Sequence, residues 1–268
     1  KVMQNAGNIE TLNKINEIGD ELALVLIGGV NYYTGQVFDM KTITEAGHKQ
    51  GAYVGWDLAH AAGNVKLELH DWNVDFAAWC TYKYLNAGPG SLAGLFVHEK
   101  HAKNKDLPRF AGWWNHNKET RFNMRQPFDV MEGAEGWQLS NPPILSMAAI
   151  KASLDLFDEV GMEALREKSE KLTGYFEYLI HEIDSDDIKI ITPNNPKERG
   201  CQLSIQVKNT DNRDRALSNN LPCRLAQMCL RLMPARVIGK LTTKLKISRL
   251  ILPTEDDLGN GFRREVLY

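Results

Sequence analysis

One lysine, Lys83, has surroundings suited to covalent chemistry. It follows a predicted buried strand, lies between Tyr82 and Tyr84, and precedes a turn that contains Gly88 and Gly90. Apolar surroundings disfavour the ammonium form of a lysine, so its free amine becomes available as a nucleophile. Such an amine can form a Schiff base with a carbonyl compound. Alone, the pattern also fits a surface lysine at a strand end, with its aliphatic stem lying over aromatic rings.

A carboxylate and an imidazole follow the preceding predicted strand. Asp57 ends that strand and His60 comes three residues later. Ligands of open α/β sheets bind beyond the carboxyl ends of the strands, so we expect Asp57 and Lys83 to face one crevice. A carboxylate paired with a pyridine nitrogen keeps that nitrogen protonated and makes the ring an electron sink, and His60 would lie beside or over the ring. Singly, Asp57 fits a helix cap and His60 a core histidine. Together with Lys83 they indicate pyridoxal phosphate (PLP).

The elements that must position these residues alternate between strands and helices. Short apolar runs predict buried strands at 22–27, 52–57, 75–80 and 94–97. A helix is predicted at about 40–49, with Asp39 as its N-cap and Gly51 beyond its end. This alternation predicts an α/β domain with a mostly parallel sheet.

The second half of the chain has a different organisation. Apolar residues at helical spacing predict helices at about 143–158 and 161–183, and strands are predicted at 188–191 and 201–207. We therefore place part of a large domain at 1–157, the start of a smaller α+β domain at 158–209, and an atypical tail at 210–268. The tail holds eleven basic and six acidic residues, whereas residues 1–209 hold 21 basic and 28 acidic ones.

Composition excludes several classes of protein. The chain is 43% hydrophobic and 25% charged, which argues against disorder and fibrous repeats. Its formal net charge of −2 provides no overall positive potential that would attract nucleic acid. The sequence contains no apolar run long enough to cross a membrane. Four cysteines without CxxC spacing favour free thiols and a cytoplasmic location. His98 and His101 form an HxxH pattern, but two ligands are a weak metal signal and we expect no metal.

Beyond these features, the chain resembles the kynureninase family from about residue 8 to residue 209. Five motifs carry the resemblance in the family's order, and they lie at 56–65, 70–77, 82–88, 111–122 and 139–145. The resemblance implies a fold-type I PLP enzyme with helices on both faces of the sheet, built as a homodimer with active sites at the subunit interface. It implies hydrolytic Cβ–Cγ cleavage of L-kynurenine or 3-hydroxykynurenine to anthranilate or 3-hydroxyanthranilate and L-alanine, in tryptophan catabolism and NAD precursor synthesis.

The resemblance also assigns roles to single residues. Lys83 would form the internal aldimine and remove the α-proton, Asp57 would hold the pyridine nitrogen, and His60 would lie close to the ring. Tyr82 would bond the phosphate. The remaining assignments are Trp113 and Asn141 as residues that reach the cofactor, often from the partner subunit, and His116 and Asn141 as residues near the substrate's aromatic ring. Without the resemblance, Trp113 fits a core residue and Asn141 a helix cap.

The sequence departs from the family at three places. The N-terminal part that supplies phosphate contacts and a stacking aromatic has no match, Gly28 stands where some members have serine, and the match stops after about Asn209. The family's arginine for the substrate carboxylate therefore has no clear counterpart here. Two alternatives remain open: a cysteine desulfurase-like lyase, which needs a reactive cysteine on a mobile loop, and an inactive partial chain.

Overall fold

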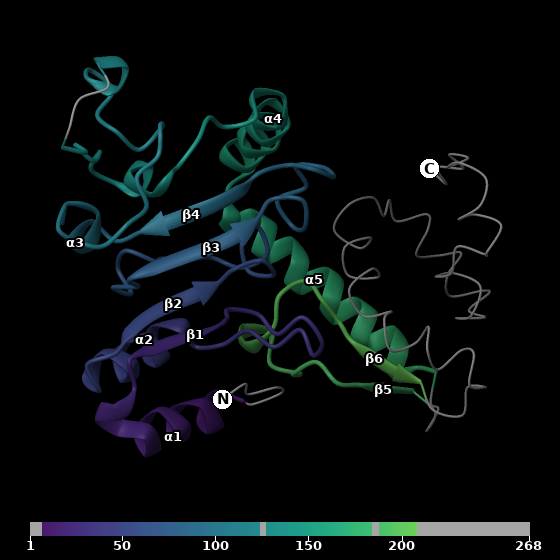
Figure 1. The fold of residues 1–268 in the computed structure, drawn as a ribbon. Helices are drawn as coiled ribbons and strands as arrows, with labels where there is room; N and C mark the ends of the chain where they lie inside the picture. The colour runs from purple at the N-terminus through teal and green to yellow at the C-terminus, as the bar shows by residue number, and fades with distance from the viewer. Residues whose placement is uncertain (1–6, 124–126, 184–187, 208–268) are drawn as a thin grey trace. The chain divides into compact units, whose positions relative to one another are not determined.

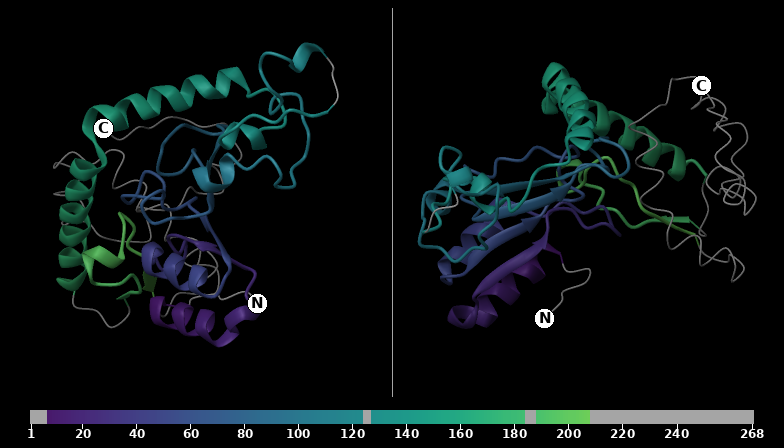
Figure 2. Two further views of the ribbon diagram at one scale, coloured as in Figure 1. Left: turned by 90° about the vertical axis from the view of Figure 1, so that its left-hand side faces the viewer. Right: turned by 45° about the horizontal axis from the view of Figure 1, so that its top comes forward.

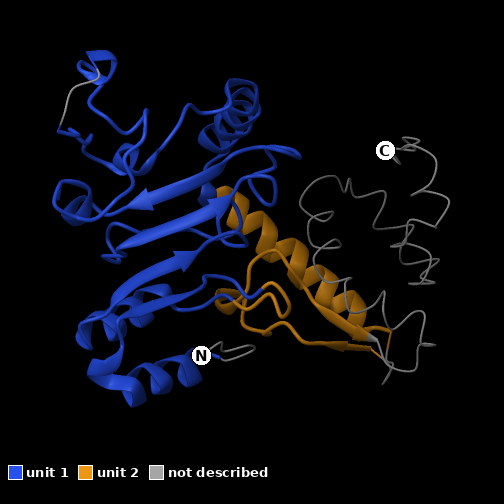
Figure 3. Ribbon diagram, in the orientation of Figure 1, with its two compact units in different colours: residues 1–31, 37–163 blue, residues 32–36, 164–268 orange. Residues whose placement is uncertain are grey.

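The computed structural model describes residues 7–123, 127–183 and 188–207, and the chain divides into two compact units. The first unit comprises Lys1–Asn31 and Val37–Glu163, and the second comprises Tyr32–Gln36 and Ala164–Tyr268 (Figure 3). The predictions made for the tail at 210–268 lie outside the described residues.

A four-stranded sheet forms the centre of the first unit (Figure 1). In spatial order its strands are β1 (Leu24–Gly28), β2 (Tyr53–Asp57), β3 (Phe76–Cys80) and β4 (Ala93–Val97). The first three strands are parallel and β4 is antiparallel to β3. The predicted α/β class and mostly parallel sheet are confirmed, and Asp57 lies between Gly28 and Ala78 in the register.

Two helices, α1 (Asn8–Ile18) and α2 (Met40–Lys49), lie side by side and pack against the core (Figure 2). Asp39 caps α2 as predicted, because its Oδ1 accepts the Thr42 N–H at 3.0 Å. A Cβ on Gly47 would lie 2.6 Å from a methyl group of Val54, so glycine at this position lets α2 approach the sheet closely. Trp56 is fully buried in this core.

The other face of the sheet is open within this unit. Its side chains include Leu24, Leu26, Tyr53 and Leu95, each between 44% and 54% exposed. Alternation along each strand explains the contrast, because successive side chains point to opposite faces. The expected helical cover is thus found on one face of the sheet within the described part of the first unit.

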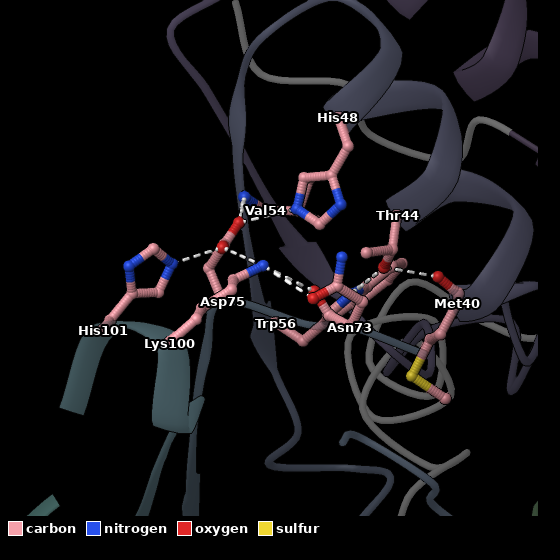
Figure 4. A network of polar contacts seen from close by, with 9 residues as sticks. All are labelled: Met40, Thr44, His48, Val54, Trp56, Asn73, Asp75, Lys100 and His101. Atoms are coloured by element: carbon pink, nitrogen blue, oxygen red, sulfur yellow. Dashed lines mark hydrogen bonds and ion pairs between the residues drawn. The ribbon is translucent and has the colours of Figure 1, made fainter. Parts of the chain in front are cut away.

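A buried carboxylate joins several elements at the amino ends of the parallel strands (Figure 4). Asp75 Oδ2 accepts the Val54 N–H at 2.6 Å and lies 2.8 Å from His48 Nε2. Its Oδ1 lies 2.6 Å from His101 Nε2 and 2.8 Å from Lys100 Nζ. Burial alone raises the pKa of the Asp75 carboxyl, but Lys100, His101, the Val54 amide and His48 together hold that pKa well below its usual range.

The rest of the first unit is mostly loop, with α3 (Glu99–Ala102), short 3₁₀ turns at Arg121–Asn123 and Ala134–Trp137, and α4 (Ile144–Val160). Two hydroxyls tie α4 to the chain that follows β3. Ser146 Oγ donates to Gly90 O at 3.2 Å, and Ser153 Oγ donates to Leu85 O.

The second unit contains most of α5 (Met162–His181), a 3₁₀ turn at Pro196–Glu198, and an antiparallel pair formed by β5 (Ile188–Ile190) and β6 (Ile205–Val207). The predicted strand at 201–207 is wrong over its first residues. There Gln202 Nε2 donates to Tyr32 O at 2.9 Å and Ser204 Oγ donates to Tyr33 O at 2.6 Å. The Ser204 N–H donates to Thr192 Oγ1 at 2.7 Å, so a side chain takes the place of a backbone partner at this residue. Among the described helices of the chain, we find none with the length and apolar character needed to span a membrane.

Candidate active site

The carboxyl end of β2 turns sharply at Asp57. The Leu58 N–H donates to Ala78 O on β3 at 2.9 Å, and the Ala59 N–H donates to Asp57 Oδ1 at 2.9 Å. Asp57 is exposed, in contrast to the buried Trp56 before it. The strand end and its turn therefore present a carboxylate at the edge of the sheet, as the sequence predicts.

The structure brings His60 and Lys83 into direct contact. Their Nε2 and Nζ atoms lie 2.9 Å apart, and the His60 ring meets the Tyr84 ring edge-on at 5.9 Å. Burial, with a smaller contribution from the charge of Lys83, lowers the pKa of His60 to about 4, although Asp57 opposes the change. Near neutral pH the imidazole is therefore uncharged and lies under the electrostatic influence of both predicted site residues.

The contact between His60 and Lys83 requires a close approach of the loop after β2 to the loop after β3. Gly63 has a φ of +77°, and a Cβ there would lie 2.9 Å from backbone atoms of Tyr84 and Leu85. The Asn64 side chain donates to His60 O at 2.9 Å and holds the first loop in shape. Glycine at position 63 is thus required both by its backbone conformation and by the space available.

A cavity of about 540 Å³ opens at this end of the sheet. Asp57 is the acidic residue among the lining side chains, and several other lining residues are small, namely Gly28, Ala59, Ala78 and Ala93. Lys83 and His60 do not line it, although Cys80 at the end of β3 does. Small side chains beside an exposed carboxylate leave room for a planar ring at Asp57.

Tyr82, the predicted phosphate ligand, is 49% exposed. Lys83 Nζ lies 5.9 Å from the centre of its ring. A hydrogen bond with the Cys80 thiol raises the pKa of the Tyr82 hydroxyl. The phenol is therefore neutral near pH 7 and can donate a hydrogen bond to an anion.

Trp113, His116 and Asn141 belong to a separate loop region. The Trp114 N–H donates to Leu139 O at 3.2 Å, which brings the segment that carries Trp113 beside the segment that leads to Asn141. Trp113 is 42% exposed and meets Phe122 edge-on, so it is not a core residue. The N-cap of α4 is Pro143, which removes the helix-cap interpretation of Asn141.

The contacts described for His116 remain within this loop region. Its Nε2 lies 3.2 Å from Thr120 Oγ1, and its backbone oxygen accepts from the buried Arg121 at 3.2 Å. The structure therefore does not join Trp113 and His116 to the group formed by Asp57, His60 and Lys83.

One residue of this region carries an organising role that sequence reasoning did not assign. The fully buried Asn115 accepts the Gly112 N–H at 2.8 Å and donates to Phe110 O and Gly136 O at 2.9 and 3.1 Å. An asparagine within the Trp-Trp-Asn-His motif was the available signal, since asparagine side chains often replace missing backbone partners in loops.

The histidines of the HxxH pattern have structural partners. His98 Nδ1 accepts the Lys100 N–H at 3.2 Å at the start of α3, and its ring stacks on His70 at 4.8 Å. His101 binds Asp75. Within residues 7–123, 127–183 and 188–207, no cluster of three or more metal-ligating side chains is found.

Comparison with known proteins agrees with this fold class. Residues 2–222 match the aminotransferase class-V family, and the chain belongs to that family. It is 65% identical over 199 residues to a kynureninase of Flavobacterium psychrophilum and 54% identical over 208 residues to a kynureninase of Nematostella vectensis. These matches cover 73% and 74% of this chain but 47% and 45% of the relatives, so the chain spans about half their length.

A solved structure shares the fold at low sequence identity. An apo cysteine desulfurase from Thermococcus onnurineus NA1 superposes with a TM-score of 0.62 at 16% identity, covering 86% of this chain and 56% of that one. Identity at this level supports the architecture alone.

Proposed function

We propose that this chain carries the catalytic lysine region of a kynureninase, a PLP-dependent hydrolase that cleaves L-kynurenine or its 3-hydroxy analogue. The observation that carries the proposal is the contact of Lys83 with the uncharged His60, within the electrostatic reach of Asp57. An amine, a neutral imidazole and a carboxylate at the carboxyl ends of parallel strands suit a pyridine aldehyde better than any other cofactor class we considered. The high identity to kynureninases directs the choice of substrate.

The residues present fit PLP. The cavity of about 540 Å³ beside Asp57 has room for the pyridine ring, and Asp57 would hold the ring nitrogen. Lys83 would bind the aldehyde carbon covalently through Nζ, and its four-carbon stem gives it the reach. Tyr82 would donate its hydroxyl to the phosphate. When bound, PLP supplies an electron sink for the charge left at the substrate α-carbon.

Each predicted site residue has a separate role in the proposed reaction. Lys83 Nζ would take the α-proton of the substrate, and the Asp57 carboxylate would accept a hydrogen bond from the protonated ring nitrogen and so favour its positive charge. His116 and Asn141 would orient the aryl group, and Trp113 would cover the site. The overall reaction would cleave the Cβ–Cγ bond of kynurenine with addition of water and give anthranilate and alanine.

A cysteine desulfurase-like activity is the second candidate within the fold. It requires an exposed, mobile thiol as the acceptor of sulfur. Of the two cysteines in the described residues, Cys80 lies on β3 and Cys201 is 3% exposed. Neither of these two cysteines suits that role, and Cys223 and Cys229 lie outside the described residues.

We also propose a homodimer. Six large apolar side chains in the loop region of the first unit and the start of α4 are unusually exposed: Phe110 (82%), Trp113 (42%), Phe122 (72%), Leu139 (45%), Ile144 (79%) and Leu145 (90%). Exposed apolar side chains in this number indicate an interaction surface, and a second copy of the chain would cover them. Trp113 and Asn141 would then face the partner's site. Neither Cys80 nor Cys201 forms a disulfide within the described residues. We propose a cytoplasmic location, as the cysteine pattern of the sequence predicts.

The proposal is tested by reducing the PLP-treated chain with borohydride and mapping the modified lysine by mass spectrometry. Modification at Lys83, absent from Lys83→Ala and retained in the matched surface variant Lys66→Ala, is the expected result. Products are then assayed separately. Anthranilate from kynurenine supports the hydrolase, sulfide from cysteine supports the desulfurase, and neither product with Lys83 modified supports an inactive partial chain.

A further inference from the structure

The direction of the hydrogen bond between His60 and Lys83 depends on the charge of the lysine and the tautomer of the histidine. An ammonium group carries donors only, so in the contact of 2.9 Å the imidazole Nε2 must accept. A neutral imidazole that accepts at Nε2 carries its proton on Nδ1. With Lys83 charged, the contact therefore requires the Nδ1–H tautomer of His60.

We propose that His60 is a positioning residue for Lys83, whose Nζ donates one hydrogen to the unprotonated His60 Nε2 in both its amine and its ammonium states. The inference rests on the proposed function, since it assigns His60 to the lysine rather than to the cofactor alone. With one N–H fixed on His60, the free amine has a restricted set of directions for its lone pair. After Lys83 takes the α-proton, the same acceptor stabilises the resulting cation.

The surrounding structure holds the imidazole in this role. Tyr84 meets the ring edge-on, and Gly63 allows the loop of His60 to approach the backbone of Tyr84 and Leu85. A positioning residue acts only if its own ring is held in place, because a small displacement weakens a hydrogen bond steeply.

The charges that face His60 come from two elements. Lys83, in the loop after β3, disfavours a proton on the imidazole, whereas Asp57, at the end of β2, favours one. Burial adds to the effect of Lys83 and is the larger cause, so the pKa of His60 falls to about 4. The imidazole is thus an acceptor over the whole neutral range and would lose that role only in acid.

The first experiment needs no cofactor. Imidazole ¹⁵N chemical shifts of the whole chain, with the His60 signals assigned by difference from His60→Gln, report both tautomer and pKa. We expect the Nδ1–H tautomer with a pKa near 4. Lys83→Met, which keeps the length of the side chain but removes donor and charge, should raise the pKa of His60 and release the fixed tautomer. An Nε2–H tautomer in the unmodified chain, or no change in Lys83→Met, overturns the proposal.

The second experiment uses the PLP-loaded chain and its rate of α-proton exchange with D₂O. His60→Leu removes the acceptor and should slow exchange by about 10- to 100-fold, the value of a hydrogen bond to a charged group. His60→Gln retains an acceptor oxygen and should recover part of that loss, while KM changes little in both variants. Exposed His70→Gln is the matched control. Equal rates in His60→Leu and the unmodified chain contradict the inference, whereas absence of PLP at Lys83 contradicts only the proposed function.

Discussion

Replacing Asp75 by asparagine removes one charge from the network that joins α2, β2 and α3. Asp75 is 3% exposed and has four partners on its two carboxylate oxygens. Asparagine has nearly the same shape but offers one acceptor oxygen and one NH₂ group. Whichever way the amide turns, two donors lose the carboxylate oxygen and face an NH₂ group, from which an imidazole can accept only by changing its tautomer.

The size of the effect follows from these lost contacts. Hydrogen bonds to charged groups contribute about 1.5–3 kcal/mol each, so two of them give about 3–6 kcal/mol. The Lys100 side chain is 33% exposed and regains water, which reduces the loss. We expect the free energy of unfolding to fall by about 3 kcal/mol, a large share of the stability of an ordinary domain.

Urea unfolding followed by tryptophan fluorescence measures the change in the free energy of unfolding of the first unit, which contains Asp75. All six tryptophans lie between Trp56 and Trp137, within the first unit. Since the pKa of Asp75 is lowered by folding, its stabilisation is complete above the unfolded carboxyl pKa of about 4 and is lost as the pH falls below it. The difference in the free energy of unfolding between the unmodified chain and Asp75→Asn should therefore be constant near neutral pH and decrease in acid.

The control is Asp71→Asn, since this neighbouring carboxylate is 79% exposed and contacts only the exposed ring of His70 among the described residues. It should change the free energy of unfolding by less than about 0.5 kcal/mol. An Asp75→Asn protein as stable as this control at pH 7 would refute the reasoning, and so would a difference that grows as the pH is lowered.

Three further predictions concern the site. Gly63→Ala should break the contact of His60 with Lys83, which NMR would detect as a changed imidazole tautomer. The control is Gly51→Ala, because Gly51 has a similar φ of +81° but open space around it. This control should lose only about 1–2 kcal/mol of stability. Asp57→Asn should retain PLP absorbance but slow α-proton exchange into D₂O by about 100-fold or more, and an unchanged rate contradicts the role of Asp57. Asn141→Ala should alter the ratio of kcat/KM for kynurenine and 3-hydroxykynurenine without changing the PLP absorbance, and an equal loss for both substrates would leave Asn141 as a general positioning residue.

The strands and the main helices could be predicted because their signals are local. Each predicted strand of the first unit lies within two residues of the observed one, and Asp39 caps α2 as its side chain chemistry indicates. The strand predicted at 201–207 was wrong over residues 201–204 for a non-local reason. Its alternating pattern is real, but Gln202 and Ser204 bind a loop about 170 residues earlier in the chain.

The contacts at the site were predictable in kind but not in detail. The ends of β2 and β3 place Asp57 and Lys83 at one edge of the sheet, which topology alone requires. That His60 reaches the lysine depends on the close loop approach at Gly63, a packing detail without a sequence signature. The Asp75 network joins residues about 27 positions apart, and the one local signal was an acid between Val74 and Phe76 in a buried run.

Two aspartates of one sheet illustrate how the fold separates structural from chemical roles. Asp75, at the amino ends of the strands, is buried and its oxygens are occupied by four donors, so it can add nothing to a ligand without loss of stability. Asp57, at the carboxyl end of β2, is exposed and accepts one backbone amide in its own turn, which leaves acceptor capacity toward the cavity. A carboxylate fixed by its backbone but incompletely bonded is suited to bind a cationic ring nitrogen. The same residue type therefore anchors the sheet at one end and is available for chemistry at the other, and the difference comes from the number of donors that the fold supplies to each.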